Sequence, residues 1–243
     1  MKRAVIIGAT SGIGHEVAKV LLLQGWNIGV AGRRKTALDT FRTIAPDRIE
    51  TEVIDVTRPE APEKLHQLIE KLGGMDLFLL SAGVGHQNTE LDPAIELDTV
   101  STNVEGFTRM VNAGFHYFKT QNKGHLAVIS SIAGTKGLGV APAYSATKRY
   151  QNTYIDALDQ LAHLQKLNIR FTDIRPGFVD TDLLKDGHYP MLMNARQTAI
   201  KIVKALDHKR RVAIIDWRYA ILVFFWRLIP RWLWSKLPIK TKK

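Results

Sequence analysis

The 243-residue sequence contains no cysteine, so disulfide bonds and thiolate metal sites are excluded. A reducing compartment fits such a chain. Beyond residue 216 the longest uncharged run, Tyr219–Trp226, has eight residues, far fewer than the roughly 20 needed to span a bilayer. Between Arg3 and Gly8 lie only four apolar or small residues, too few for the apolar segment of a signal peptide. No low-complexity tract interrupts the chain, and no metal site is predicted.

Charge is distributed unevenly along the sequence. The net charge is +11, yet residues 1–200 hold 22 Lys and Arg against 21 Asp and Glu. Residues 201–243 hold 12 Lys and Arg against only Asp207 and Asp216, together with four of the five tryptophans. The sequence therefore predicts a nearly neutral body followed by a basic, aromatic C-terminal tail. No nucleic-acid-binding motif accompanies this charge.

The body alternates short apolar runs with longer helical patterns, of which the first spans Gly12–Gln24. Apolar runs of this kind are typical of parallel strands that are covered on both faces. This alternation predicts an α/β fold with one doubly wound parallel sheet of the Rossmann type. We expect a single domain over residues 1–216 and a tail over residues 217–243. The predicted strands are Ala4–Ile7, Ile28–Ala31, Glu52–Asp55, Leu77–Leu80, Leu126–Ile129, Arg170–Ile174 and Arg211–Ile215.

A glycine-rich loop, Gly8-Ala-Thr10-Ser11-Gly12-Ile13-Gly14, lies between the first predicted strand and the first helix. Glycines there permit a tight turn and a close approach of the backbone to a pyrophosphate. The N-terminus of the following helix offers unpaired N–H groups and a favourable dipole to such an anion. An ordinary turn is the alternative, but the strand–loop–helix context favours a dinucleotide cofactor.

The second predicted strand is followed by Arg33 and Arg34, and residues 32–35 contain no acid. A carboxylate at this point is typical of NAD sites, whereas arginine accommodates the 2′-phosphate of NADP. We therefore expect NADP(H), although solvated surface arginines are the alternative. Asp55 and Val56, after the third predicted strand, are expected to border the adenine, and a capping aspartate is an almost equal alternative.

Tyr144 and Lys148 lie four residues apart, hence on one face of a helix. A nearby ammonium favours the phenolate, so we expect Lys148 to lower the pKa of Tyr144 from about 10. Ser131, after the strand Leu126–Ile129, could bind a substrate carbonyl. Asn103 could hold a water that connects to Lys148. A Tyr/Lys pair alone is more often structural, but together with the glycine loop it favours catalysis.

These ordered motifs resemble those of the short-chain dehydrogenases/reductases of the compact, single-domain type. The resemblance runs from about Arg3 to Ile215, and it departs from the common pattern at Ile7 and at Leu80-Ser81. It is carried by Gly8-x-x-x-Gly12-x-Gly14, Ser81-Ala82-Gly83, Asn103, Ser131, Tyr144-x-x-x-Lys148, Pro176-Gly177 and Thr181.

The resemblance implies a catalytic tetrad of Asn103, Ser131, Tyr144 and Lys148 that moves a hydride between NADP(H) and a carbonyl or alcohol. A non-catalytic NADP(H)-binding regulator on the same fold is the alternative. The resemblance further implies a homodimer or homotetramer, and a lid over the substrate at residues 182–193, for which an ordinary packed loop is an equal alternative. It assigns the remaining cofactor contacts to Ala82, Gly83, Pro176, Gly177, Val179 and Thr181, with Tyr144 and Lys148.

The tail permits two interpretations. Tryptophans with interleaved cations favour a segment that lies on an anionic membrane surface, which would place a cytoplasmic enzyme on the cytoplasmic face of a membrane. A hydrophobic or lipidic substrate would suit this place and the apolar lid. The arginines, however, do not follow one helical face. An arm packed on the body or on a partner subunit is therefore the other interpretation.

Overall fold

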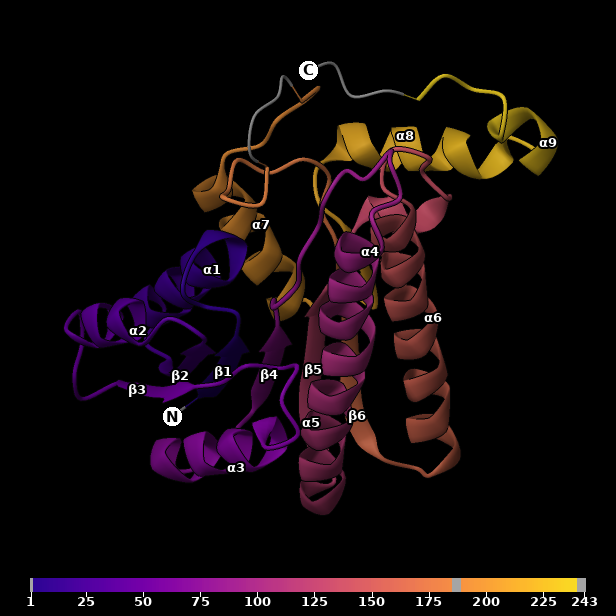
Figure 1. Ribbon diagram of the computed structural model, residues 1–243. Coiled ribbons are helices and arrows are strands. Elements are labelled where there is room, and N and C mark those ends of the chain that lie inside the picture. Colours follow the sequence, from indigo (N-terminus) through magenta and orange to yellow (C-terminus); the bar gives the residue numbers. More distant parts are fainter. Residues whose placement is uncertain (1, 185–188, 240–243) are drawn as a thin grey trace.

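The computed structural model describes residues 2–184 and 189–239 (Figure 1). It forms a seven-stranded sheet with helices on both sides. In chain order the elements are β1 (Arg3–Ile7), α1 (Gly12–Leu23), β2 (Asn27–Gly32), α2 (Lys35–Arg42), β3 (Ile49–Val53), α3 (Ala61–Leu72), β4 (Leu77–Leu80), α4 (Pro93–Val100), the π-helical turn η1 (Ser101–Gly106), α5 (Phe107–Gln121), β5 (Lys123–Ile129), the 3₁₀ turn η2 (Ile132–Thr135), α6 (Pro142–Leu164), β6 (Asn168–Arg175), α7 (Ala195–Asp207), β7 (Val212–Ile214), α8 (Trp217–Leu228) and α9 (Arg231–Trp234).

The strands pair in parallel in the order β3-β2-β1-β4-β5-β6-β7, which confirms the predicted doubly wound sheet. The order reverses between β1 and β4. In such sheets ligands bind beyond the carboxyl ends of the strands at this switch point. The loop that follows β1 is the glycine-rich loop, and Ser81–Gly83 follow β4. The topology therefore brings two of the motifs to the expected binding edge.

One predicted strand is misplaced along the chain. β3 covers Ile49–Val53 rather than Glu52–Asp55, and Ile49 pairs with Ile28 of β2. β3 is an edge strand, and only its first residue is buried, so it has no continuous apolar run. The pattern that found the central strands therefore located only the end of this one.

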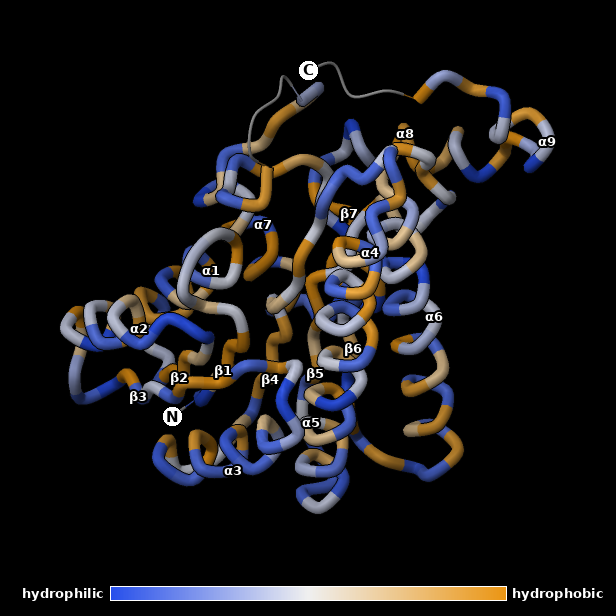
Figure 2. The backbone as a smooth tube through the Cα atoms, in the orientation of Figure 1, coloured by the Kyte–Doolittle hydropathy of each residue, from blue (hydrophilic) through white to orange (hydrophobic). Residues whose placement is uncertain are grey.

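The two faces of the sheet carry separate cores. Ala4 and Ile6 point into a core that includes α1 and α7, whereas Val5 and Ile7 point into one formed with α3, α5 and α6. All four of these β1 side chains are fully buried. Figure 2 shows the hydrophobic strands inside this double layer. Burial on both faces explains why the strands read as unbroken apolar runs.

The C-terminal stretch begins as part of the first core. α8 and α9 lie above the carboxyl end of the sheet in Figure 1, and α8 packs against η2. Tyr219 is 0% exposed and Val223 is 1% exposed, and both belong to the core of α1 and α7. Of the two interpretations of the tail, packing on the body therefore holds for this inner side of α8. Within residues 2–184 and 189–239, no helix combines the length and the hydropathy needed to cross a bilayer.

Candidate active site

The glycine-rich loop packs tightly against the segment after β4. Gly8 has φ of +88°, and a Cβ added there would lie 2.5 Å from the Ala82 backbone nitrogen, so only glycine fits. Ser11 caps α1 without a side-chain hydrogen bond, and the first turn of α1 contains no acid. The first N–H groups of α1 are therefore available to an anion. Thr10, Ser11, Gly12, Ile13 and Gly14 surround this helix end, as the loop motif predicted.

The segment that follows β6 reaches the glycine-rich loop. A Cβ on Gly12 would lie 3.5 Å from the Thr181 side chain, so Thr181 lies beside this loop. Val179 is buried, and its backbone forms a bridge with Met193. The predicted lid is described in part, and residues 185–188 lie outside the described residues. The ring centroids of Tyr189 and Phe178 lie 4.9 Å apart.

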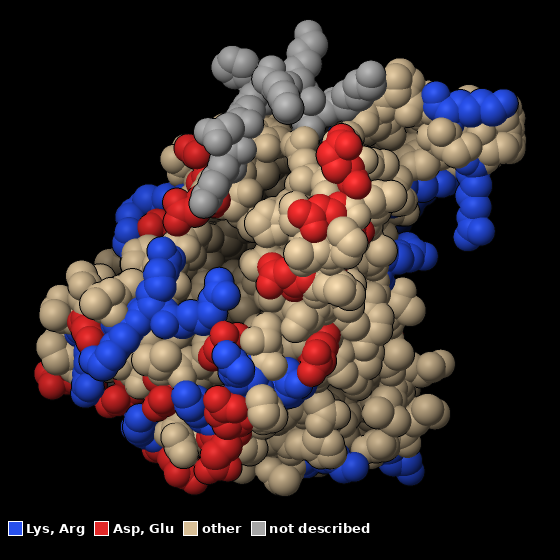
Figure 3. Space-filling view, viewed as in Figure 1, with Lys and Arg blue, Asp and Glu red and all other residues tan. Residues whose placement is uncertain are grey.

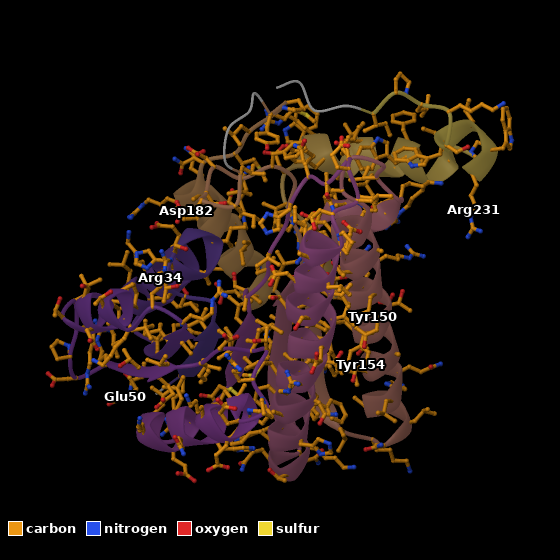
Figure 4. The ribbon with its side chains drawn as sticks, viewed as in Figure 1. Arg34, Glu50, Tyr150, Tyr154, Asp182 and Arg231 are labelled. Atoms are coloured by element: carbon orange, nitrogen blue, oxygen red, sulfur yellow. The ribbon has the colours of Figure 1, made fainter. Side chains whose placement is uncertain are left out.

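The two arginines after β2 lie beside the glycine-rich loop. Arg34 donates from Nε and Nη2 to the Thr10 hydroxyl at 3.4 and 3.2 Å, so its guanidinium lies next to the loop (Figure 4). Both arginines are exposed. Figure 3 shows basic side chains beside a hollow on this face of the molecule. The position suits a phosphate group that reaches from the loop toward β2.

Asp55 behaves more like a turn-capping residue than a free ligand. Its Oδ1 accepts hydrogen bonds from the Thr57 N–H at 3.0 Å and from the Thr57 hydroxyl at 2.8 Å. Partial burial raises the pKa of Asp55, but these hydrogen bonds and the charges of Arg33 and Arg58 outweigh it and lower the pKa. Val56 is buried against Gly106. Asp55 thus shapes the turn after β3 rather than capping a helix, because α3 begins at Ala61 with Glu60 as its N-cap. Its place beside the adenine stays a prediction.

Ser131 and Tyr144 meet beyond the carboxyl end of β5. Ser131 caps η2 and accepts a hydrogen bond from the Ala133 N–H at 3.0 Å. Burial raises the pKa of the Tyr144 phenol, while its hydrogen bond with Ser131 acts in the opposite direction. The expectation that Lys148 lowers this pKa is not met in the chain alone, because desolvation of the phenol has the larger effect.

Lys148 lies one turn along α6 from Tyr144, with its Nζ 5.7 Å from the phenol ring centroid. The ammonium is buried and donates to the Ile129 carbonyl at 3.1 Å and to Gln151 Oε1 at 3.0 Å. Burial lowers the pKa of Lys148 to about 8, and the Asp173 carboxylate opposes that shift. An ammonium has three donors, so one remains for a ligand.

Asn103 is fully buried in η1, and both ends of its side chain are engaged. Its Oδ1 accepts from the Val84 N–H at 2.9 Å, and its Nδ2 donates to the Val84 carbonyl at 2.7 Å and to Thr147 Oγ1 at 3.2 Å. The turn is π-helical, a conformation that is frequent at functional sites. Asn103 thus fixes the segment that follows β4 beside α6.

Gln151 was missed by the sequence analysis. Its Nε2 donates to the backbone carbonyl of Asn103 at 2.9 Å, while its Oε1 accepts from Lys148. The Gln151 side chain therefore connects Lys148 to the Asn103 backbone. The water expected between Asn103 and Lys148 stays a prediction. Its position three residues after Lys148, on the same helix face, was the available signal.

The remaining motif residues converge on the same place. A Cβ on Gly83 would lie 3.2 Å from Asn103 Oδ1 and 3.5 Å from Lys148 Nζ. Ala82 packs against Gly8, and the Ser131 hydroxyl donates to the Pro176 carbonyl at 3.5 Å. Gly177 lies under the ring of Tyr219, where an added Cβ would be 2.2 Å away. The chain thus brings together residues separated by about 170 positions.

A buried polar network, also missed by the sequence analysis, supports the site from behind. Asp173 of β6 pairs with Arg175, whose Nη2 lies 2.6 Å from Asp173 Oδ2. Asp173 also accepts hydrogen bonds from the Ser130 hydroxyl and from Asn152 Nδ2. Asp173 is 0% and Arg175 6% exposed. Because Ser130 precedes Ser131, this network fixes the strand end that carries the catalytic candidate.

Comparison with known proteins defines the class to which this fold and site belong. The sequence profile of the short chain dehydrogenase family matches residues 2–189. An uncharacterized oxidoreductase of Myxococcus xanthus is 30% identical over 237 residues, which cover 94% of this chain and 93% of the relative. One from Staphylococcus saprophyticus is 32% identical over 192 residues, which cover 76% of this chain and 81% of the relative. The chain belongs to the short-chain dehydrogenase family of oxidoreductases.

Solved structures share the same fold. A short-chain dehydrogenase from Streptomyces avermitilis superposes with a TM-score of 0.80 at 23% identity, covering 93% of this chain and 92% of that one. A 3-ketoacyl-(acyl-carrier-protein) reductase from Brucella melitensis, complexed with NADH, gives a TM-score of 0.78 at 23% identity, with coverages of 88% and 95%. A serine dehydrogenase complexed with NADP⁺ gives 0.76 at 19% identity, with coverages of 88% and 94%.

Proposed function

We propose that this oxidoreductase transfers a hydride between NADP(H) and a carbonyl or alcohol, with Tyr144 as its acid/base. The observation that carries the proposal is the contact of Tyr144 with Ser131 at the switch-point edge of the sheet, one helical turn from the buried Lys148. A binding regulator does not require a phenol, a hydroxyl and an ammonium gathered in this way. Mutation of Tyr144 to Phe is the direct test.

The nicotinamide supplies or accepts the hydride, and the chain's own residues manage the carbonyl oxygen and its proton. In reduction, the Ser131 and Tyr144 hydroxyls both donate to the substrate oxygen, and Tyr144 Oη transfers its proton as hydride arrives. The cation at Lys148 favours the phenolate that remains. Its free donor is available to the ribose hydroxyls. Gln151 and Asn103 hold Lys148 in place, and oxidation runs in reverse.

The cofactor preference rests on Arg33 and Arg34. A charge-assisted hydrogen bond to phosphate is worth roughly 1.5–3 kcal/mol, or about 10- to 100-fold in affinity. We expect NADPH to bind at least about 10-fold more tightly than NADH. Arg34→Ala should reduce this ratio of the two affinities. Fluorescence titration of the protein with each cofactor measures both affinities.

The control for this titration is Arg42→Ala, which removes an exposed cation of the neighbouring α2 that pairs with Glu50 at 3.6 Å. This variant should keep the NADPH/NADH ratio of the wild type. Equal affinities for the two cofactors in the wild type would mean that Arg33 and Arg34 only face solvent.

The proposed assembly is a homodimer or homotetramer through α5 and α6. Tyr150 and Tyr154 stack with ring centroids 5.6 Å apart on α6 (Figure 4), and Phe107 of α5 packs against both. The outer side of α6 leaves Leu161 and Leu164 exposed. We expect light scattering at micromolar concentration to give a dimer or tetramer. A stable monomer would contradict this assembly.

The proposed location is the cytoplasm, with peripheral contact to the cytoplasmic face of a membrane through residues 217–243. The basic, aromatic composition of this segment supports it, since anionic lipids concentrate in the cytoplasmic leaflet.

A further inference from the structure

α8 has two apolar faces, only one of which is covered by the protein. Tyr219 and Val223 turn into the core. On the opposite side, Trp217, Ile221 and Phe224 are 70%, 49% and 60% exposed. Positions 217, 221, 224 and 228 follow helical spacing and lie on one face. We call the exposed side chains Trp217, Ile221, Phe224, Phe225 and Leu228, with Trp232 of α9, the outer stripe.

The outer stripe differs from the rest of the described surface. Among the large hydrophobic side chains that are exposed in residues 2–184 and 189–239, every Phe and Trp belongs to it. In Figure 2 this helix is largely hydrophobic although it lies at the outside of the molecule. Contiguous apolar patches of this kind mark interaction sites rather than ordinary surface.

The cations of this segment flank the outer stripe. Arg218 and Arg227 occupy the two sides of α8 between its apolar faces, because they lie about 100° and 280° around the helix from Trp217. Arg231 extends from α9 into solvent (Figure 4). The sequence analysis treated the apolar residues of this segment as one face. The arginines therefore did not follow a single polar face in that analysis.

The charges favour an anionic surface over a second copy of the chain. Residues 217–243 contain seven Lys and Arg and no Asp or Glu. The Arg218 guanidinium already pairs with Asp216 at 2.9 Å. A symmetric contact of two outer stripes would bring Arg227, Arg231 and Lys236 of both copies together without a carboxylate from residues 217–243 to pair them. Tryptophan and phenylalanine flanked by arginine and lysine match the interface of a bilayer with anionic headgroups.

The segment α8–α9, called the arm below, is hydrogen-bonded to two loops that carry residues close in sequence to the catalytic candidates. The Lys136 ammonium donates to the Ile229 carbonyl at 2.8 Å, and Trp234 Nε1 donates to the Gly137 carbonyl at 2.7 Å. Lys136 and Gly137 lie in the loop between Ser131 and Tyr144. In the loop after β6, the Phe178 N–H donates to the Tyr219 hydroxyl at 3.1 Å, and this hydroxyl lies 3.0 Å from the Pro190 carbonyl.

The base of the arm is fixed as well. Asp216 caps α8 by accepting from the Arg218 N–H at 3.1 Å, and its carboxylate also binds Lys201 of α7 at 2.8 Å. The segment α8–α9 therefore keeps a fixed position relative to the loops that follow β5 and β6.

We propose that the outer stripe docks on an anionic lipid bilayer and holds the mouth of the active site against it. The substrate class is then a carbonyl or alcohol on a long apolar chain dissolved in the membrane. This substrate assignment rests on the proposed hydride transfer, whereas the docking rests on the outer stripe and extends the membrane contact proposed for residues 217–243.

The test uses the full-length protein and vesicles of phosphatidylcholine with or without phosphatidylglycerol. We expect co-sedimentation with the anionic vesicles, a blue shift of tryptophan emission on binding, and weaker binding as salt screens the charges. Phe224→Ser/Leu228→Ser should abolish co-sedimentation. The matched control, Leu23→Ser/Ile200→Ser, changes exposed apolar residues of α1 and α7 and should bind as the wild type does.

Activity is then compared on a long-chain ketone carried in the vesicles and on a short soluble ketone. The stripe variant should lose activity on the first and keep it on the second. The docking proposal is wrong if the wild type does not co-sediment with anionic vesicles. It is also wrong if Phe224→Ser/Leu228→Ser changes the oligomeric state in light scattering and leaves vesicle binding unchanged. If vesicle binding holds but no carbonyl or alcohol is turned over, the proposed function fails and the docking stands.

Discussion

Replacing Tyr144 by Phe is expected to lower kcat by about 10²–10⁴-fold, the range that a positioned proton donor contributes. The variant loses only the hydroxyl that contacts Ser131, so the phenyl ring still fills its place in α6. NADPH affinity should remain close to that of the wild type, because the glycine-rich loop and Arg34 are untouched. Steady-state kinetics and cofactor titration on the same preparation separate the two effects.

Tyr150→Phe provides the matched control. Tyr150 lies on the same helix, and its hydroxyl bonds to Thr108 at 2.8 Å rather than to Ser131. Its removal should change the rate little. A Tyr144→Phe enzyme that kept more than about a tenth of the wild-type activity would show that Tyr144 is not the proton donor.

Replacing Arg175 by Met is expected to destabilise the protein by about 3–5 kcal/mol, the cost of breaking a buried ion pair from one side. Asp173, which is 0% exposed, would then keep a charge without its counterion. Urea denaturation followed by circular dichroism measures the free energy of unfolding.

Two further variants separate the pair from a general effect of the substitution. Arg170→Met removes an exposed arginine from the same strand and should change stability little. Asp173→Asn/Arg175→Met removes both charges and should recover part of the loss. If Arg175→Met were as stable as Arg170→Met, the buried pair would contribute nothing to the fold.

Most of the fold could be predicted from the sequence because the central strands are buried on both faces. Leu77–Leu80 were located to the residue, since every one of them contacts a core. The edge strand β3 was shifted because only Ile49 of its five residues is buried and its glutamates interrupt the apolar run. An unbroken apolar run therefore marks a strand only where all its residues are buried on both faces of the sheet.

The sequence predicted less well the residues of the candidate site that only position other side chains. Tyr144 and Lys148 share a helix turn, so their spacing alone places them together. Gln151 and the pair of Asp173 and Arg175 carry no motif, and their roles depend on which backbone carbonyl or carboxylate the fold brings near. The buried and exposed apolar faces of α8 could not be distinguished from the sequence either. Both faces are apolar, and only the fold shows that Tyr219 packs into the core.

The position of Tyr219 also bears on the order in which the protein is completed during synthesis. The glycine-rich loop is made first, and its partner strands follow within the first half of the chain. Gly177 and Phe178 pack against and hydrogen-bond to Tyr219, about 40 residues later in the chain. Because domains fold as they are synthesised, the segment around Gly177 gains this contact only after α8 has been made. We therefore expect a chain that ends before Tyr219 to lack this support at the proposed nicotinamide end of the site.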